Sequence, residues 1–138
     1  MRSSEEVLLA GCGVLEPLLA AHSFVWVPGV TGPSSGGDFA SGSFVRGKRR
    51  IELHFRHSLG LVEYHVGGVS IDHAAYMCAV LGTKGGNQYP GFSSDPIDAF
   101  RHLAHDLGRF CQAFLSGADG EFEVIASRAA FDVRKRLP

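Results

Sequence analysis

The sequence predicts an α+β fold, in which an antiparallel β-meander of three to four strands is covered on one face by packed helices. Three observations lead to this prediction. Alternating apolar and polar residues with turn signals between them fill residues 38–66. Apolar residues at helical spacing occupy the first twenty residues and the C-terminal half. The 138 residues are 45% hydrophobic and 20% charged, which suits one domain over 1–138 with a single core.

The N-terminal segment is expected to be a helix from Ser3 or Ser4 to Ala21, because its apolar residues recur every three or four positions. Pro17 is expected to kink this helix or to begin a second short one. The β-prone residues 24–27 then form a short strand that ends at a Pro-Gly pair. Residues 29–37 are expected to be a flexible loop, since they lack the Gly-Lys-Ser/Thr ending of a phosphate-binding loop.

The register of the predicted meander follows from its two turns. Residues 47–48 are Gly-Lys, the form of a two-residue hairpin turn, which pairs Phe44 with Ile51. A four-residue turn at 57–60 then pairs Ile51 with Val66 in the third strand. This alignment places the apolar residues of all three strands on one face, and a slip by one residue would expose them.

The opposite face of the meander is expected to carry polar residues in two rows. The first row holds Ser43, Glu52 and His65, and the second holds Ser41, His54 and Glu63. Directly opposed side chains have Cβ atoms roughly 5 Å apart. We therefore expect a lattice of two serines, two histidines and two glutamates, which is the candidate functional site.

The C-terminal half is expected to be helical. The expected helices run from Ser70 or Asp72 to Gly82, from Asp95-Pro96 to Gly117, and over residues 121–136. A long loop over residues 83–94 is expected to join the first two helices. A strand at residues 122–125 is the alternative to the last helix. The Asp-Pro pair is the best helix start in the chain, because a capping residue is followed by proline at the first helical position.

Ser41, His54 and Glu63 are the candidate catalytic residues, because they are the residue types of a hydrolytic triad. A serine hydroxyl needs a base, and a histidine base needs an acid to fix its tautomer. However, the sequence has no Gly-x-Ser-x-Gly elbow, and the amides of a flat strand are committed to the sheet rather than to an oxyanion. Hydrolysis is therefore the alternative function.

The same lattice offers metal-ligand types, since imidazole and carboxylate suit zinc or a similar divalent ion. His54, His65, Glu52 and Glu63 alternate in a checkerboard, but no Cys-x-x-Cys or His-Glu-x-x-His spacing supports the site. Glu and His on neighbouring strands also pair simply as opposite charges. We therefore expect an ion-pair lattice with no metal and no other cofactor, and a metal-dependent enzyme stays with the hydrolase as the alternative.

The residues around the lattice point to a binding surface. Phe39, Val45 and Leu61 are expected on the same face, which either a partner protein or the C-terminal helix would cover. The candidate binding residues are Glu52, His65, Arg56, Tyr89 and Phe92, the last two in an aromatic loop. A ligand pocket between the loops at 34–37 and 85–92 is a third hypothesis.

Charge and cysteine content exclude several classes of protein. The formal net charge is −1 and basic stretches have acids nearby, so nucleic-acid binding is not expected. No apolar run approaches the ~18 residues of a membrane span. Three scattered cysteines in apolar helical stretches fit a reducing compartment, so we expect the cytoplasm.

These exclusions leave a soluble single-domain protein-interaction or accessory module as the first functional hypothesis. Small immunity and antitoxin proteins are of this size and class, and they act by binding without intrinsic catalysis. A protein partner is therefore expected. Edge strands that nothing covers could also pair across a two-fold axis, which leaves a homodimer open.

Overall fold

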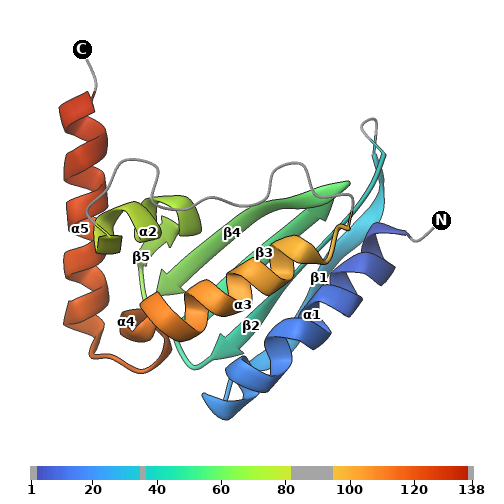
Figure 1. Cartoon of the computed structure of the whole chain (residues 1–138), viewed down its shortest axis with the longest axis horizontal. Coiled ribbons are helices and arrows are strands. Elements are labelled where there is room, and N and C mark those ends of the chain that lie inside the picture. Colours follow the sequence, from blue (N-terminus) through green and yellow to red (C-terminus); the bar gives the residue numbers. More distant parts are fainter. Residues whose placement is uncertain (1–2, 35–36, 82–94, 137–138) are drawn as a thin grey trace.

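The computed structural model describes residues 3–34, 37–81 and 95–136, and it has the predicted α+β architecture (Figure 1). The elements follow in the order α1 (Ser4–Ala21), β1 (Val25–Ser34), β2 (Gly37–Arg46), β3 (Arg49–Arg56), β4 (Ser58–Val66), β5 (Val69–Asp72), α2 (His73–Leu81), α3 (Asp98–Phe110), α4 (Gln112–Leu115) and α5 (Asp119–Arg136). The strands form one antiparallel sheet in chain order, β1-β2-β3-β4-β5. The described sheet thus has five strands rather than the predicted three to four.

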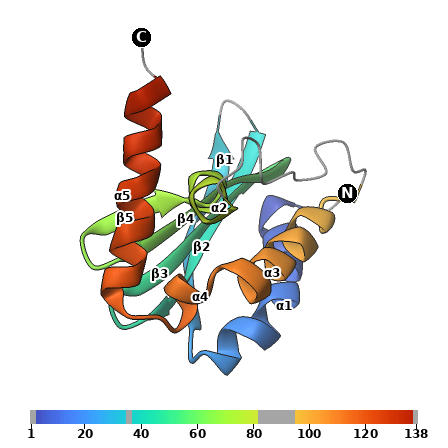
Figure 2. The same cartoon turned by 60° about the vertical axis from the view of Figure 1, so that its left-hand side comes forward.

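The helices lie on one side of the sheet (Figures 1 and 2). Helices α1 and α3 lie side by side, and α1 packs on β2 and β3. The main contacts of α5 are with α2, α4 and the edge strand β5. The C-terminal helix was one of the two candidates expected to cover the polar face of the sheet. It does not do so, because α5 meets the sheet at the β5 edge.

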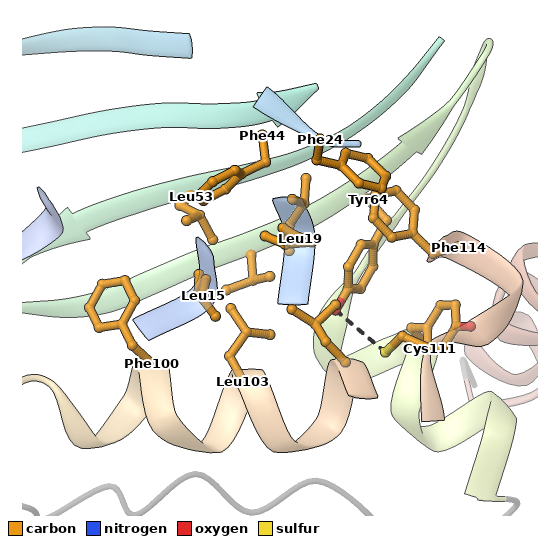
Figure 3. Packing of buried hydrophobic residues seen from close by; sticks show 14 of the residues in the cluster. Leu15, Leu19, Phe24, Phe44, Leu53, Tyr64, Phe100, Leu103, Cys111 and Phe114 are labelled. Atoms are coloured by element: carbon orange, nitrogen blue, oxygen red, sulfur yellow. Dashed lines mark hydrogen bonds between the residues drawn. The ribbon is translucent and has the colours of Figure 1, made fainter. Parts of the chain in front are cut away.

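The core forms between this helical layer and the inner face of the sheet (Figure 3). Leu15 and Leu19 of α1 meet Leu53 of β3 and Tyr64 of β4, and all four are fully buried. The Tyr64 ring centroid lies 4.7 Å from that of Phe114 in α4. Burial alternates along β3 and β4, so each strand has one face in this core and one face away from it.

Strand β1 is longer than predicted. The short strand expected at residues 24–27 continues to Ser34, so the described part of the expected loop at 29–37 belongs to the β1–β2 hairpin. The pairing shifts between Pro28 and Thr31. Proline is tolerated here because β1 is an edge strand, where a missing N–H can point away from the sheet.

The remaining differences concern where helices begin and end. Ser70 lies in the short strand β5, which was not predicted, and α2 begins after Asp72, whose carboxylate accepts a 2.7 Å hydrogen bond from the amide of Ala75. One helix was expected from Asp95 to Gly117, but Cys111 separates α3 from α4. Helix α1 runs continuously through Pro17, so no second helix begins there.

Gly11 sets how closely α1 approaches α3. A Cβ atom at position 11 would overlap the ring of Phe100, whereas one at position 13 of the same helix would meet nothing within 4 Å. We therefore expect Gly11→Ala to lower the free energy of unfolding by about 2 kcal/mol through overpacking. Gly13→Ala is the matched control and should raise it by about 0.5–1 kcal/mol, because alanine is the better helix former. Urea unfolding of both variants checks this pair, and equal gains in stability would contradict the close packing.

Candidate functional site

The candidate site lies on the outer face of the sheet, which is the face turned away from the helices (Figure 2). Its side chains come from the residues that alternate with the buried ones on β2, β3 and β4. Three cross-strand rows make up its centre: Val25, Val45, Arg50, His65 and Ser70; Val27, Ser43, Glu52, Glu63 and Asp72; and Ser41, His54 and Leu61. Glu52, Glu63 and His65 are half-buried, with 20–33% of each side chain exposed.

The predicted register is confirmed between β2 and β3 and is wrong between β3 and β4. Ser41 lies opposite His54, as expected. In the second hairpin Ile51 pairs with Tyr64, not Val66, which is a shift of two residues. Strand β3 ends at Arg56 and β4 begins at Ser58, so His57 alone, at φ 63°, makes the turn that was expected to take four residues.

This shift keeps the polar residues on one face but exchanges their neighbours. Glu63 lies opposite Glu52 rather than opposite His54, and His54 lies opposite Leu61. His65 lies opposite Arg50 rather than Glu52. Two glutamates directly opposite each other would repel, so this pair depends on the positive or donating groups around it.

Glu52, His54, Glu63 and His65 form a carboxylate–imidazole cluster on β3 and β4. His54 Nε2 lies 2.6 Å from Glu52 Oε2. His65 Nε2 lies 3.2 Å from Glu52 Oε1 and 3.1 Å from Glu63 Oε1. Arg50 Nη2 also lies 3.2 Å from Glu52 Oε1. Glu52 is therefore the centre of the cluster, because His54 contacts its Oε2 while His65 and Arg50 contact its Oε1.

The electrostatics of Glu52 follow from these contacts. The hydrogen bond that His54 donates holds the pKa of the Glu52 carboxyl below its usual value, and partial burial opposes this effect. The charges of His54, Arg50 and His65 add to the lowering. Glu52 is therefore a carboxylate at neutral pH and serves as an acceptor or a ligand, not as a proton donor.

The structure does not join Ser41, His54 and Glu63 into a triad. The Ser41 hydroxyl donates to the carbonyl of Val30 at 3.2 Å and accepts from the Val30 amide at 3.1 Å. The acid that contacts His54 is Glu52. The predicted adjacency of His54 and Glu63 is wrong, because it depended on the four-residue turn that His57 replaces.

A hollow of about 250 Å³ lies beside the cluster, at the end of the sheet where the β3–β4 pairing is irregular. It is lined by Phe39, Ala40, His54, Phe55, Arg56, Gly60 and Leu61. The guanidinium of Arg56 stacks over the Phe39 ring, 5.7 Å from its centroid. The pairing is irregular between His54 and Phe55, and Gly60 brings no side chain into the hollow.

A larger cavity of about 460 Å³ lies at the start of α1 and is lined by Ser4, Val7, Asp38, Phe55, His57, Asp95 and Pro96.

The other predicted binding residues are placed only in part. Arg56 borders the hollow and Glu52 and His65 belong to the cluster. Tyr89 and Phe92, together with most of the loops proposed as a ligand pocket, lie outside the described residues.

A buried polar network on the inner face of the sheet was not predicted from the sequence. His73, the first residue of α2, is 2% exposed. Its Nδ1 lies 2.6 Å from the Tyr64 hydroxyl and its Nε2 lies 3.0 Å from Asp106 Oδ2. The Tyr64 oxygen also lies 3.7 Å from the sulfur of Cys111 (Figure 3). Asp106, a charged residue on an otherwise apolar side of α3, was the one signal in the sequence.

Burial controls the protonation of this network. It lowers the pKa of His73, against the opposing effect of Asp106, and it raises the pKa of the Cys111 thiol to about 12. With His73 neutral, one proton order satisfies each group: the thiol donates to Tyr64, Tyr64 to Nδ1 of His73, and Nε2–H to Asp106. All four groups are buried, so the network is assigned to the core rather than to the site.

No helix within the described ranges is long and apolar enough to cross a bilayer. Searches with protein-family models, against curated proteins and against solved structures find no match to this chain.

Proposed function

We propose that this chain is a protein-binding module without catalysis of its own, as small immunity and antitoxin proteins are, and that it binds its partner through the outer face of β1–β4. The observation that carries the proposal is a broad sheet face that the helices leave uncovered. Exposed apolar residues that gather on one face of a sheet are typical of a protein-interaction surface.

The apolar part of this face lies on the edge strand β1. Val25, Val27 and Val30 are 65%, 48% and 63% exposed. Val25 and Val27 lie opposite Val45 and Ser43, so their side chains share the outer face with the cluster. An apolar strip beside a polar cluster is the composition of a protein-binding surface.

The hollow indicates the chemistry of the partner. Its walls include the apolar Phe39 and Leu61, and its polar groups include the guanidinium of Arg56 and the imidazole of His54. A carboxylate on an apolar stem complements this set, because the guanidinium of Arg56 donates to carboxylates. We therefore propose a partner that inserts an acidic side chain into the hollow and covers Val25 and Val27 with apolar residues.

A second copy of the chain fits the surface less well. In a two-fold dimer whose outer sheet faces pack on each other about the sheet centre, the Glu52 and Glu63 carboxylates of one copy would face those of the other copy and repel them. Pairing through the β1 edge is restricted by Pro28 and Pro33, which have no N–H to donate, and by the shift in pairing between Pro28 and Thr31. The proposed partner is therefore a different protein.

The cytoplasm remains our proposal for the location. All three cysteines, Cys12, Cys78 and Cys111, are free. Burial is the main cause that raises the pKa of the Cys12 thiol to about 12, and a buried protonated thiol is unreactive. Free, buried cysteines are typical of a reducing compartment.

Selection of displayed peptides on the immobilised protein tests the proposed function. We expect enriched peptides to carry Asp or Glu beside a large apolar residue, and their affinity to fall at least tenfold for Val27→Asp and Leu61→Asp. Leu9→Asp is the matched control, since Leu9 on α1 is 51% exposed on the helical side, and it should leave binding unchanged. No enrichment, or equal binding to all three variants, would contradict the proposal. So would turnover of a small ester or phosphate ester that His54→Ala abolishes.

A further inference from the structure

We infer that Glu52, Glu63 and His65 form a binding site for a single divalent transition-metal ion, for which zinc is the best match. This inference goes beyond the proposed function and does not depend on a partner protein. It also differs from the metal hypothesis of the sequence, which took four equivalent ligands from a register that the structure does not have.

The first observation is the convergence of three ligand atoms. One atom from each of Glu52, Glu63 and His65 lies within 4.8 Å of the others. His65 Nε2 lies 3.2 Å from Glu52 Oε1 and 3.1 Å from Glu63 Oε1. Ligands at 2.0–2.1 Å from a tetrahedral zinc ion are about 3.3 Å apart. Small side-chain movements would therefore place an ion among the three atoms.

The second observation is that one ring nitrogen of His65 lies within hydrogen-bond distance of two carboxylate oxygens. His65 Nε2 faces two carboxylate oxygens, but a ring nitrogen carries at most one hydrogen and can donate well to only one of them. The two glutamates also lie directly opposite each other, where like charges repel. A divalent cation in place of that proton would bind all three atoms and neutralise both carboxylates.

The surrounding residues fit the role of support. His54 holds Oε2 of Glu52 at 2.6 Å, which leaves Oε1 turned toward His65. Metal-binding carboxylates are commonly oriented in this way by a neighbouring hydrogen bond. Arg50 contacts the same Oε1 at 3.2 Å, and a carboxylate oxygen has two lone pairs, so it accepts from Arg50 while it binds the ion. His54 is thus a positioning residue rather than a ligand.

The chemistry of the three ligands selects the class of ion. One imidazole with two carboxylates suits zinc and related divalent ions better than calcium or magnesium, which prefer oxygen ligands alone. Three protein ligands leave a fourth tetrahedral position, which on this face water would occupy. The site therefore has the composition of an open zinc site.

The pattern repeats in the sequence. Glu52-Leu53-His54 on β3 and Glu63-Tyr64-His65 on β4 have the same Glu-x-His spacing, which puts both polar residues of each strand on the outer face. Because the strands are antiparallel and the glutamates are opposite, the two histidines lie on opposite sides of the glutamate pair. His65 bridges both glutamates, whereas His54 contacts Glu52.

Titration of the metal-free full-length chain with Zn²⁺ by calorimetry, and with Co²⁺ by visible absorption, tests the inference. We expect one ion per chain and the absorption of tetrahedral cobalt without a thiolate charge-transfer band. Glu63→Gln and His65→Gln should each weaken binding at least 100-fold, and His54→Gln about 10–100-fold, as loss of a supporting hydrogen bond does. Circular dichroism and melting without metal confirm that each variant is folded.

His102→Gln and Glu123→Gln are the matched controls, since both residues are exposed on the helical layer, and they should bind the ion as the parent does. Cys78→Ser tests whether a thiol binds the ion, because Cys78 is the most accessible of the three cysteines. This variant should bind the ion with unchanged affinity. A Kd weaker than about 1 mM, or unchanged binding by Glu63→Gln and His65→Gln, would overturn the inference. The peptide selection that tests the proposed function is run with a chelator present, so that its result does not depend on a bound metal ion. A failed selection and a failed metal titration are then separate results.

Discussion

Replacing Arg49 with methionine is expected to lower the free energy of unfolding by about 3 kcal/mol, because three backbone carbonyls lose their charged donor in a buried site. Arg49 is 8% exposed. Its Nη1 donates to the carbonyls of Phe114 at 2.7 Å and Ala113 at 3.3 Å, and its Nη2 donates to that of Gly117. The carbonyls of Ala113 and Phe114 lie in the last turn of α4 and that of Gly117 lies in the turn before α5, so the guanidinium caps α4 and fixes β3 to this turn.

Urea unfolding measures this effect, and two further variants separate its causes. Arg49→Lys keeps the charge but loses the planar fork, so it should recover less than half of the loss. Arg101→Met is the control for a surface arginine, since Arg101 is 55% exposed and pairs with Asp95 and Asp98; it should change stability by no more than about 1 kcal/mol. Equal effects of Arg49→Met and Arg101→Met would show that the capping contacts contribute nothing.

Replacing His73 with glutamine is expected to cost about 3–4 kcal/mol at pH 7, because a buried histidine links two other buried polar groups. The imidazole accepts from the Tyr64 hydroxyl and donates to Asp106. Glutamine is too flexible and has the wrong shape to meet both groups, so the Asp106 carboxylate, with only 12% of its side chain exposed, would lose its close partner.

The loss should depend on pH, and its sign follows from the pKa of His73. Burial lowers this pKa in the folded chain from its usual 6.5, whereas the unfolded chain keeps the usual value. Below about pH 6.5 the unfolded state therefore binds a proton that the folded state resists, and the parent loses stability as the pH falls. Above pH 6.5 His73 is neutral in both states, so the parent keeps its full stability there. The His73→Gln variant has no titrating group at this position, so this loss of stability on acidification is absent from it.

The gap in unfolding free energy between parent and His73→Gln should consequently narrow from pH 7 to pH 5. His102→Gln, on the exposed side of α3, is the matched control and should follow the parent at each pH. A gap that stays constant or widens on acidification would mean that His73 is not held neutral by burial.

The first hairpin of the meander could be predicted because its local signals agree with the hydrophobic pattern. The Gly-Lys turn at 47–48 has a glycine at φ 58°, and it fixes the pairing of Phe44 with Ile51. A one-residue slip there would expose the core face, so few alternatives exist.

The second hairpin could not be predicted from the same rules. A slip by two residues keeps every side chain on its face, so the hydrophobic pattern is the same for the predicted and the observed register. Histidine at φ 63° in a one-residue turn has no sequence signal comparable to glycine. Gly60, which is left unpaired where the β3–β4 pairing shifts after His54, fits the end of a four-residue turn equally well. The face of the site was therefore predictable, but the neighbours within it were not.

Tertiary contacts explain the other misses. His73 looks like a helix-end residue because its partners, Tyr64 and Asp106, are distant in sequence and belong to β4 and α3. The role of Arg49 is hidden in the same way, because in a basic run at 48–50 only this side chain faces the inside of the sheet.

Both proposals depend on how β3 and β4 are aligned, since that alignment joins Glu52, Glu63 and His65 and shapes the hollow at Leu61. Cross-strand nuclear Overhauser effects measure it directly, because opposed residues of an antiparallel pair bring backbone protons close together. We expect contacts between Glu52 and Glu63 and between His54 and Leu61. Contacts between Glu52 and His65 and between His54 and Glu63 would contradict this alignment.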